Sequence, residues 1–402
     1  MTSEPFTLRW GILATGGIAT TFAKDLLVPP STRAVHDIHH TITAAASSSS
    51  LARATTFLHS LGVPAATPHA SYAALVRDEN VDIIYIATPH SHHYAHALLA
   101  LHAGKHVLVE KPVCVTAAQA RRLYALAKEK QRFVMEAVWT RFFPLFREIQ
   151  GFVREGRLGT VKRVHADLSF WNGVASEFGT EHRMVNTQLA GGALLDLGLY
   201  SLTWVFGVLW HLQAQDAAER EAPRVKAAMS LYSATGCDEM TAVLLEFRDA
   251  WVGGRETAAE GGNGDAHAVA LTNIRVSNEP NLEHPGPDPV RIQGTLGDIS
   301  VAAPSYRPLA YTLTPAKSER RGRPADFEYE RKTFEIPGGH GMFWEADECA
   351  RCIRDGKLES EVIGWEESIQ IMEVMDEVRR QGELKYPEAI ESVEYPLEGF
   401  GL

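Results

Sequence analysis

The sequence predicts an α/β protein in which a doubly wound parallel sheet is followed by an α+β domain with a large, mainly antiparallel sheet. Residues 8–137 alternate short, continuous apolar runs with amphipathic stretches, a pattern of buried parallel strands joined by helical crossovers. After residue 141, polar and apolar residues alternate in runs that Gly- and Pro-rich turns separate, which is typical of antiparallel strands. We therefore expect one domain at residues 1–138 and a second at residues 139–402.

The first domain is expected to form a parallel sheet of five predicted strands. Residues 106–110 form the fourth of these strands. Strands are predicted at residues 8–13, 41–46, 82–88, 106–110 and 133–138, with helices at residues 17–27, 51–62, 93–104 and 117–130 between them. Right-handed crossovers place such helices on both faces of the sheet. This is the Rossmann-type arrangement that binds dinucleotides.

The second domain is expected to combine helices with a broad, mainly antiparallel sheet. Helices are predicted at residues 144–156, 189–209, 343–356 and 364–382, and the last two could pack back on the first domain. Strands are predicted at residues 159–171, 224–234, 240–248, 268–278, 290–302 and 327–336, with a hairpin tip at 253–264. A broad sheet with an apolar outer face is not expected to stay exposed to water.

Composition narrows the classes of partner. A net charge of −11 with 45% hydrophobic residues describes an ordinary globular chain and argues against a nucleic acid or an anionic membrane as the main partner. With no leader or long apolar span evident, we expect a cytoplasmic protein. Cys349 and Cys352 stand alone in a helical pattern, so we expect no metal site and no disulfide framework.

The first strand-to-helix turn, GILATGGIA, predicts a dinucleotide site. Ala14, Gly16 and Ala19 occupy the three positions of the G-x-G-x-x-G/A fingerprint. Because Ala14 replaces the first glycine, the turn is expected to adopt a backbone angle that alanine tolerates. Gly16 would let the backbone approach a pyrophosphate at the helix N-terminus. The expected contacts are Thr15, Gly16, Gly17 and Ile18. An ordinary strand-to-helix turn is the alternative.

Serines end the second strand, where NAD enzymes usually place an acid for the ribose 2′-hydroxyl. No Asp or Glu lies at residues 44–54, whereas Ser48, Ser49 and Arg53 can meet a 2′-phosphate. The sequence therefore favours NADP over NAD. The alternative is that residues 47–50 only form a loop and an N-cap.

Two further strand ends carry polar residues. The segment TPHSHHYAH at residues 88–96 lacks the Glu of an H-E-x-x-H zinc motif, so we expect Thr88, Pro89, His90 and His93 to line the nicotinamide side of the cofactor site. Lys111 follows a core strand in LVEKPV. Ligands bind outside the carboxyl ends of such strands, so Glu110 and Lys111 are expected at the site. A solvated loop lysine is the alternative.

The long apolar helix contains LLDLGLY, in which Asp196 and Tyr200 are four residues apart and share one face. An aspartate in an apolar helix is costly unless it is paired. Tyr200 could equally be a core tyrosine with a satisfied hydroxyl. The helix alone leaves both interpretations open.

Together these motifs resemble those of the glucose–fructose oxidoreductase/inositol dehydrogenase (Gfo/Idh/MocA) family. The resemblance rests on the dinucleotide turn, E-K-P at residues 110–112 and GGALLDLGLY at 191–200, and it spans nearly the whole chain. Tyr200 in place of the more common histidine, with MEAVWTRFFP at residues 135–144, is similar to the subgroup of dimeric dihydrodiol dehydrogenases and NADP-dependent D-xylose 1-dehydrogenases. Ser48 or Ser49 stands where that subgroup often has an arginine.

Sheets of this family commonly pair face to face, so the resemblance implies that the second domain binds the substrate and forms a homodimer through the region 223–336. It also implies roles for the residues named above. Tyr200 would be the acid/base, Lys111 would hold the reacting hydroxyl and stabilise negative charge, and Asp196 would orient the substrate or Lys111. Trp139, Arg141 and Phe142 would lie at the site, the first two at the cofactor. The expected substrate contacts are Lys111, Phe170, Asp196 and Tyr200.

The implied reaction oxidises the C1 hydroxyl of an aldopyranose, D-xylose first, to the lactone. Tyrosine has an ordinary pKa of about 10, and a nearby ammonium favours the phenolate. A trans-dihydrodiol dehydrogenase, or another sugar oxidoreductase of the family that cleaves a glycoside by transient oxidation, is an alternative. A non-catalytic, sugar-responsive regulator is a further alternative, against which the intact Lys111, Asp196 and Tyr200 argue.

Overall fold

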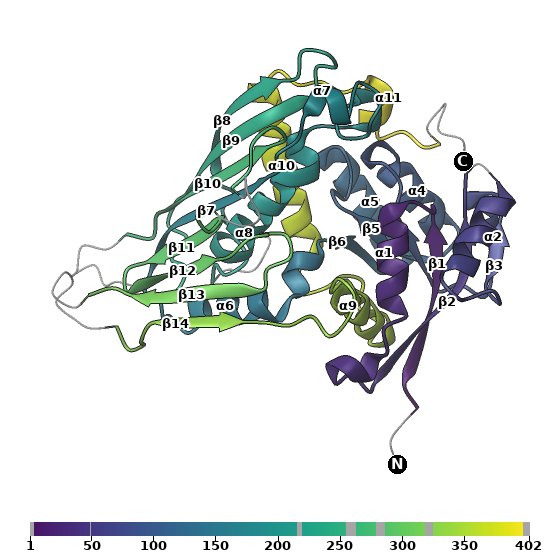
Figure 1. Cartoon of the computed structure of the whole chain (residues 1–402), viewed down its shortest axis with the longest axis horizontal. Coiled ribbons are helices and arrows are strands. Elements are labelled where there is room, and N and C mark those ends of the chain that lie inside the picture. Colours follow the sequence, from purple (N-terminus) through teal and green to yellow (C-terminus); the bar gives the residue numbers. More distant parts are fainter. Residues whose placement is uncertain are drawn as a thin grey trace. The chain divides into compact units, whose positions relative to one another are not determined.

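A computed structural model of the chain describes residues 4–48, 50–214, 219–254, 263–278, 286–317 and 325–396. The chain divides into two compact units, each made of more than one segment (Figure 1). The first unit contains Met1–Trp139, Ile336–Ser368 and Pro387–Leu402, and the second contains Thr140–Glu335 and Ile369–Tyr386.

The first unit is built on a six-stranded parallel sheet with the order β3-β2-β1-β4-β5-β6. Its strands are β1 (Phe6–Leu13), β2 (Ile38–Ala46), β3 (Thr67–His69), β4 (Ile83–Ile86), β5 (His106–Glu110) and β6 (Val134–Ala137). The connecting helices are η1 (Pro30–Arg33), α1 (Gly17–Leu26), α2 (Leu51–Ser60), α3 (Tyr72–Val76), α4 (His90–His102) and α5 (Ala117–Lys130). The predicted doubly wound parallel sheet is confirmed.

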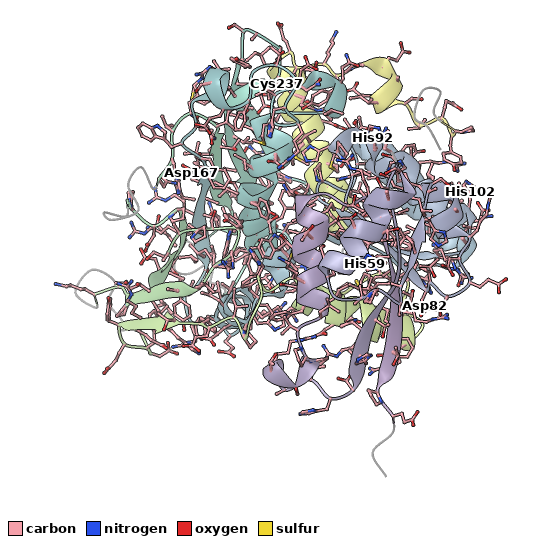
Figure 2. All side chains as sticks on the ribbon, turned by 45° about the vertical axis from the view of Figure 1, so that its right-hand side comes forward. His59, Asp82, His92, His102, Asp167 and Cys237 are labelled. Atoms are coloured by element: carbon pink, nitrogen blue, oxygen red, sulfur yellow. The ribbon has the colours of Figure 1, made fainter. Side chains whose placement is uncertain are left out.

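One detail of that prediction is wrong. The sheet contains β3, a strand of three residues with the sequence TPH, which has no apolar run to reveal it. The strand before Lys111 is therefore the fifth along the chain and not the fourth. All of β4 is fully buried, which explains its continuous apolar sequence. Arg9 Nε of β1 donates to Asp82 Oδ2 at 2.9 Å. Asp82, labelled in Figure 2, is the residue before β4, so this bond joins the two strands.

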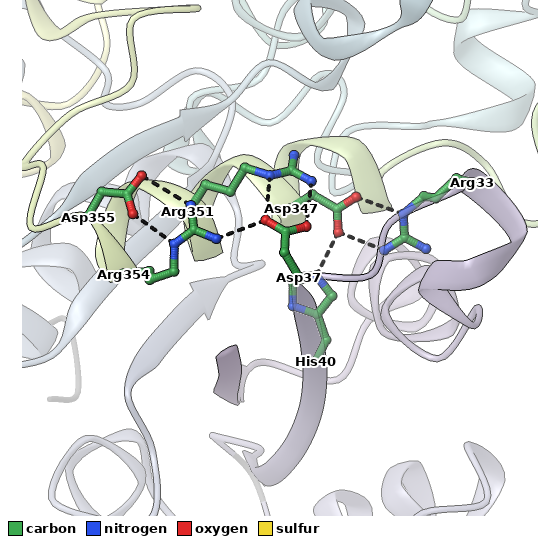
Figure 3. Close-up of polar contacts among 7 residues, drawn as sticks. All are labelled: Arg33, Asp37, His40, Asp347, Arg351, Arg354 and Asp355. Carbon is green, nitrogen blue, oxygen red and sulfur yellow. Dashed lines mark hydrogen bonds and ion pairs between the residues drawn. The ribbon is translucent and has the colours of Figure 1, made fainter. Parts of the chain in front are cut away.

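Helix α9 (Phe343–Arg354) belongs to the first unit and packs on α1, β1 and β2. Asp347 of α9 accepts hydrogen bonds from Arg33 Nε and Nη2, both at 2.7 Å, and lies 2.9 Å from His40 Nε2 (Figure 3). Trp10 Nε1 donates to His40 Nδ1 at 3.1 Å, so a neutral His40 carries its proton on Nε2 and donates to Asp347. Burial raises the pKa of Asp347, but the bonds from Arg33 and His40 outweigh burial and lower it.

The second unit is built on an eight-stranded sheet with the order β14-β13-β12-β11-β7-β10-β9-β8. Its strands are β7 (Val161–Ser169), β8 (Arg224–Leu231), β9 (Asp238–Phe247), β10 (Ala266–Asn273), β11 (Val290–Gly294), β12 (Gly297–Val301), β13 (Ala310–Pro315) and β14 (Glu330–Thr333). Only the pair of β7 and β10 is parallel among the described strands of this sheet. The predicted mainly antiparallel sheet is confirmed.

Helical segments accompany this second sheet. They are α6 (Pro144–Arg154), α7 (Val174–Glu177), η3 (Thr187–Leu189), the π-helix η4 (Leu194–Gly198) and α8 (Leu199–Leu209). The helices η2 (Trp139–Phe142), α10 (Trp365–Gln381) and α11 (Glu388–Glu391) lie at or near the points where the chain changes units. Helix α8 packs on β7 and β10. The segment Thr187–Leu209 is long and apolar enough to span a membrane, but its most apolar window is fully buried inside the protein.

Several predicted elements of the second unit differ from the structure. Helix α7 and strand β13 were not predicted. The run predicted as one strand at residues 290–302 forms the hairpin of β11 and β12. The helix predicted at 189–209 is interrupted, because η3 ends before Gly191 and the π-helix begins after Gly192. Of the predicted hairpin tip at 253–264, residues 255–262 lie outside the described residues.

Candidate active site

The dinucleotide turn lies between β1 and α1. Gly16 is the N-cap of α1, and a Cβ atom built on Gly16 or Gly17 meets no described atom within 4 Å. Space for a phosphate therefore exists beside the helix N-terminus. Thr15 precedes this N-cap, and Ile18 in the first turn is 41% exposed.

Ala14 departs from the expectation for this turn. Its φ is +87°, in the left-handed region that costs a residue with a Cβ about 1–3 kcal/mol. The prediction that Ala14 adopts an angle favourable for alanine is therefore wrong. The turn keeps the left-handed φ angle that glycine usually adopts at this position. The Ala14 N–H donates to the Ala46 carbonyl at 3.1 Å, which ties the turn to the end of β2.

A hollow beside the turn brings Thr15 and Arg53 together. Its lining consists of Thr15, Thr20, Ala52, Arg53, Thr56, Phe57 and Ser60. Ser50 is the N-cap of α2, because its hydroxyl accepts from the Arg53 N–H at 3.2 Å. Ser48 is exposed, and Ser49 lies outside the described residues. Sequence reasoning missed the hydroxyls of Thr20, Thr56 and Ser60, since they sit inside helical patterns that carry no motif.

His93 joins the ends of β4 and β5. Its Nδ1 lies 2.7 Å from the Pro112 carbonyl oxygen, and its Nε2 lies 2.9 Å from the Thr88 carbonyl oxygen. Burial, with His90 nearby, lowers the pKa of His93 to about 3. The ring is therefore neutral and donates to one carbonyl at a time.

The other histidines of this segment, His90, His92 and His96, lie in the first two turns of α4. Pro89 is the N-cap of α4 and His90 its first residue. His92, labelled in Figure 2, has its ring 5.5 Å from the ring of His96, and His96 Nδ1 lies 3.1 Å from Thr88 Oγ1. Within the described residues, no group of three or more His, Cys, Asp or Glu side chains is arranged to hold a metal.

Lys111 lies at the carboxyl edge of the parallel sheet, directly after β5. The preceding Glu110 accepts from the Tyr85 hydroxyl through Oε1 and from the Lys111 N–H through Oε2, the latter at 3.3 Å. Two residues further on, the Val113 N–H donates to Glu136 Oε1 at 2.9 Å. The structure thus gathers the turn, the His93 segment and Lys111 at the carboxyl edge, where ligands of such sheets bind.

Asp196 and Tyr200 lie in the second unit. Asp196 is in the π-helix Leu194–Gly198, a form that is rare and frequent at functional sites. Its Oδ1 pairs with Arg183 Nη1 at 3.1 Å, and its side chain is 8% exposed. Tyr200 follows in the first turn of α8 and is 7% exposed.

Tyr306 connects two of the predicted substrate residues. Its ring centroid lies 5.9 Å from that of Tyr200 and 6.1 Å from that of Phe170. The Tyr306 carbonyl accepts from Thr140 Oγ1 at 2.5 Å, which fixes its loop. Sequence reasoning missed Tyr306 and Arg183, because neither belongs to a motif or to a periodic pattern.

The G-G of the helix motif permits a close approach of backbone segments. A Cβ on Gly191 would lie 2.5 Å from the Arg183 carbonyl oxygen, and one on Gly192 would lie 2.1 Å from Asp238 Oδ1. Asp238 is fully buried and accepts from the Leu194 N–H through Oδ2 at 2.7 Å. The start of the π-helix is therefore fixed by a carboxylate from β9.

The residues after β6 divide between the units. Trp139 is the last residue of the first segment of unit one, and it is 7% exposed. Arg141 is fully buried, with its guanidinium carbon 5.2 Å from the Phe146 ring centroid, and Phe142 is also buried. Because Lys111 belongs to the first unit and Tyr200 to the second, their meeting at one substrate stays a prediction. So do the predicted cofactor contacts of Trp139 and Arg141.

Comparison with known proteins matches both parts of the chain. A family model described as an oxidoreductase family with an NAD-binding Rossmann fold matches residues 8–138, and one described as the GFO/IDH/MocA C-terminal domain matches residues 146–269.

The chain is 49% identical to a D-xylose 1-dehydrogenase (NADP(+)) from Hypocrea jecorina, over 96% of this chain and 95% of that protein. It is 30% identical to a trans-1,2-dihydrobenzene-1,2-diol dehydrogenase from Bos taurus, over 95% of this chain and 98% of that protein. A 3-ketoreductase from Actinomadura kijaniata, solved with NADP and TDP-benzene, has a similar fold with a TM-score of 0.68 at 20% identity, covering 94% of this chain and 98% of that one.

Proposed function

Because this chain belongs to the GFO/IDH/MocA family of oxidoreductases, we propose that it is an NADP-dependent D-xylose 1-dehydrogenase. One observation carries the proposal: identity of 49% over 96% of the chain to an enzyme of that name. The substrate would be the pyranose form of D-xylose and the product its lactone.

The first unit supplies features that fit NADP. The open space beside Gly16 and Gly17 suits a pyrophosphate at the helix N-terminus. Arg53 lines the hollow next to it, and no acidic residue follows β2 among residues 44–54, which favours a 2′-phosphate over a free 2′-hydroxyl. Bound NADP would supply the acceptor for the hydride from C1.

The chain's own residues would handle the proton. Tyr200 would take the proton of the C1 hydroxyl as general base. Lys111 would donate a hydrogen bond to the same oxygen and stabilise its developing negative charge. Asp196 is held by Arg183 at 3.1 Å, and this pair fixes the orientation of a carboxylate that would bind a neighbouring sugar hydroxyl.

The test is a substrate panel followed by product analysis. NADPH formation at 340 nm would be measured with D-xylose, other pentoses, hexoses and trans-dihydrodiols, each with NADP and with NAD. We expect the highest kcat/KM for D-xylose with NADP and a lactone as the product. A higher kcat/KM for a trans-dihydrodiol, with a catechol as product, would establish the alternative that the 30% identical relative suggests. No turnover of any substrate would favour a regulator.

We also propose that the second unit forms a homodimer. Met240 and Leu244 of β9 project from one face of the sheet and are 47% and 49% exposed. Two large apolar side chains on one strand face favour burial against a second copy. Sedimentation should show a dimer at micromolar concentration, and Leu244→Glu should shift the protein to monomer. A wild type that sediments only as a monomer would contradict the proposal.

A further inference from the structure

We propose that Glu136, near the end of β6, is a positioning residue that holds Lys111 in place through the backbone of residues 111–113. This role rests on the proposed function of Lys111 and adds to it. Glu136 itself would touch neither the substrate nor the cofactor.

The carboxylate of Glu136 is buried between two donors. It is 2% exposed, its Oε1 accepts from the Val113 N–H at 2.9 Å, and its Oε2 accepts from the Ser368 hydroxyl at 2.6 Å. The backbone of Glu136 pairs with Val109 of the neighbouring strand β5. The side chain therefore reaches forward, past the end of β5, to the segment that follows Lys111.

Three successive backbone groups around Lys111 have defined partners. The Lys111 N–H donates to Glu110, the Pro112 carbonyl faces His93, and the Val113 N–H donates to Glu136. Val113 is fully buried, so without Glu136 its N–H would have to find another acceptor or remain unpaired at a cost. The segment would shift to do so, and a displacement of about 1 Å can reduce a catalytic rate about 100-fold.

The charge of Glu136 adds a dependence on pH. The pKa of Glu136 is raised to about 7, and burial is the largest cause. The charge of Glu367 also raises this pKa, whereas the hydrogen bonds from Ser368 and Val113 and the charge of Lys111 lower it in part. The other titratable neighbours are Tyr124 on α5 and Cys114, and burial raises the pKa of each well above its ordinary value. They stay neutral at physiological pH. A charged acceptor makes a stronger hydrogen bond than a neutral one, so the hold on Val113 should strengthen as pH rises through about 7.

The experiment compares two substitutions of Glu136 with a matched control. Glu136→Met removes both hydrogen bonds, Glu136→Gln keeps a neutral acceptor for Val113, and Ser368→Ala removes only the second hydrogen bond to the same carboxylate. With D-xylose and NADP at pH 8, we expect kcat to fall at least about tenfold in Glu136→Met and to stay within about threefold in Ser368→Ala. In Glu136→Gln, kcat should be closer to that of the wild type than in Glu136→Met, and it should rise less between pH 6 and 8 than in the wild type. The affinity for NADP, from fluorescence titration, should change less than about twofold in all three variants.

A second measurement separates this proposal from the proposed function. The rate at which an amine-acylating reagent modifies Lys111 would be measured by peptide mass spectrometry, which requires no substrate. We expect at least about threefold faster modification in Glu136→Met than in the wild type and an unchanged rate in Ser368→Ala, because a released segment exposes its lysine. If the wild type has no dehydrogenase activity but this difference appears, the function fails and the positioning role stands. If Glu136→Met matches Ser368→Ala in Lys111 modification, Glu136 does not position Lys111, whatever the enzyme's activity.

Discussion

Glu345 should limit the stability of the first unit. It lies in the first turn of α9 and is fully buried, and within the described part of the chain neither carboxyl oxygen has a hydrogen-bond partner. Burial raises the pKa of Glu345 well above its ordinary value, and the charges of Glu110 and Asp25 raise it further. The folded protein therefore holds a proton on Glu345 that the unfolded chain releases.

The sign and size of the effect follow from this difference. Above the unfolded pKa of about 4.3, each pH unit lowers the free energy of unfolding by up to about 1.4 kcal/mol, until the pH reaches the folded pKa. The ceiling at pH 7 is about 3.7 kcal/mol. Below about pH 4 the carboxyl is protonated in both states and the contribution is absent. The buried polar oxygens cost about 1–3 kcal/mol in addition, because they lack partners.

Glu345→Gln keeps the shape and cannot titrate, and Glu345→Met also removes the polar atoms. We expect both variants to melt at a higher temperature than the wild type at pH 7, by about 2–4 °C for each kcal/mol gained. The advantage of Glu345→Gln should grow from pH 5 to pH 7 and vanish near pH 4. Differential scanning calorimetry across this range measures it, with Glu129→Gln as a control, since the Glu129 side chain is 62% exposed. If Glu345→Gln melts below the wild type at pH 7, or its advantage does not depend on pH, Glu345 is ionised and stabilised in the fold and the reasoning is refuted.

Three further predictions concern catalysis, cofactor choice and stability. Lys111→Met and Tyr200→Phe should each lower kcat/KM about 10²–10³-fold. The double variant should lose far less than the product of the two losses. A loss below about tenfold in Lys111→Met would show that Lys111 is a solvated loop residue and has no catalytic role. Ser48→Asp should shift preference from NADP toward NAD by repelling the 2′-phosphate, as the ratio of kcat/KM values would show, and a wild type that prefers NAD would contradict this. Asp347→Ala leaves two buried donors without their acceptor and should cost about 3–5 kcal/mol in urea unfolding. The control Arg354→Ala breaks two half-exposed ion pairs, with Asp37 and Asp355, and should cost less than about 1 kcal/mol. Equal losses in the two variants would contradict the argument.

Local patterns predicted most of the fold but few of the contacts that build the site. Continuous apolar runs such as that of β4, whose residues are all fully buried, were recognisable without the structure. The short strand β3 was not, because its pairing with β2 and not its own sequence makes it a strand. The prediction of one unbroken helix at 189–209 failed for a similar reason. Its start is fixed by Asp238, 44 residues beyond Leu194.

The candidate site shows the same division. The turn at Gly16, the E-K-P segment and the Asp196–Tyr200 pair carry spacings that a sequence displays. Arg183 and Tyr306 contact residues that lie 13 or more positions away along the chain, and no motif contains either of them. Glu136 lies in the segment MEAVWTRFFP, but nothing in that segment reveals its contact with Val113. The left-handed angle of Ala14 was misjudged because the fingerprint names a residue type, whereas the fold requires a backbone angle.

The first unit is assembled from segments that lie far apart along the chain, and this affects how it folds during translation. Arg33 and His40 find their buried partner Asp347 only 314 and 307 residues later. A ribosome therefore releases the nucleotide-binding sheet long before α9 exists, and until then two buried donors of the native fold have no acceptor. We expect the nascent first unit to remain incomplete through nearly all of translation and to be a target for chaperones. For the same reason a truncated gene that ends before residue 343 would encode a first unit that cannot reach its native state.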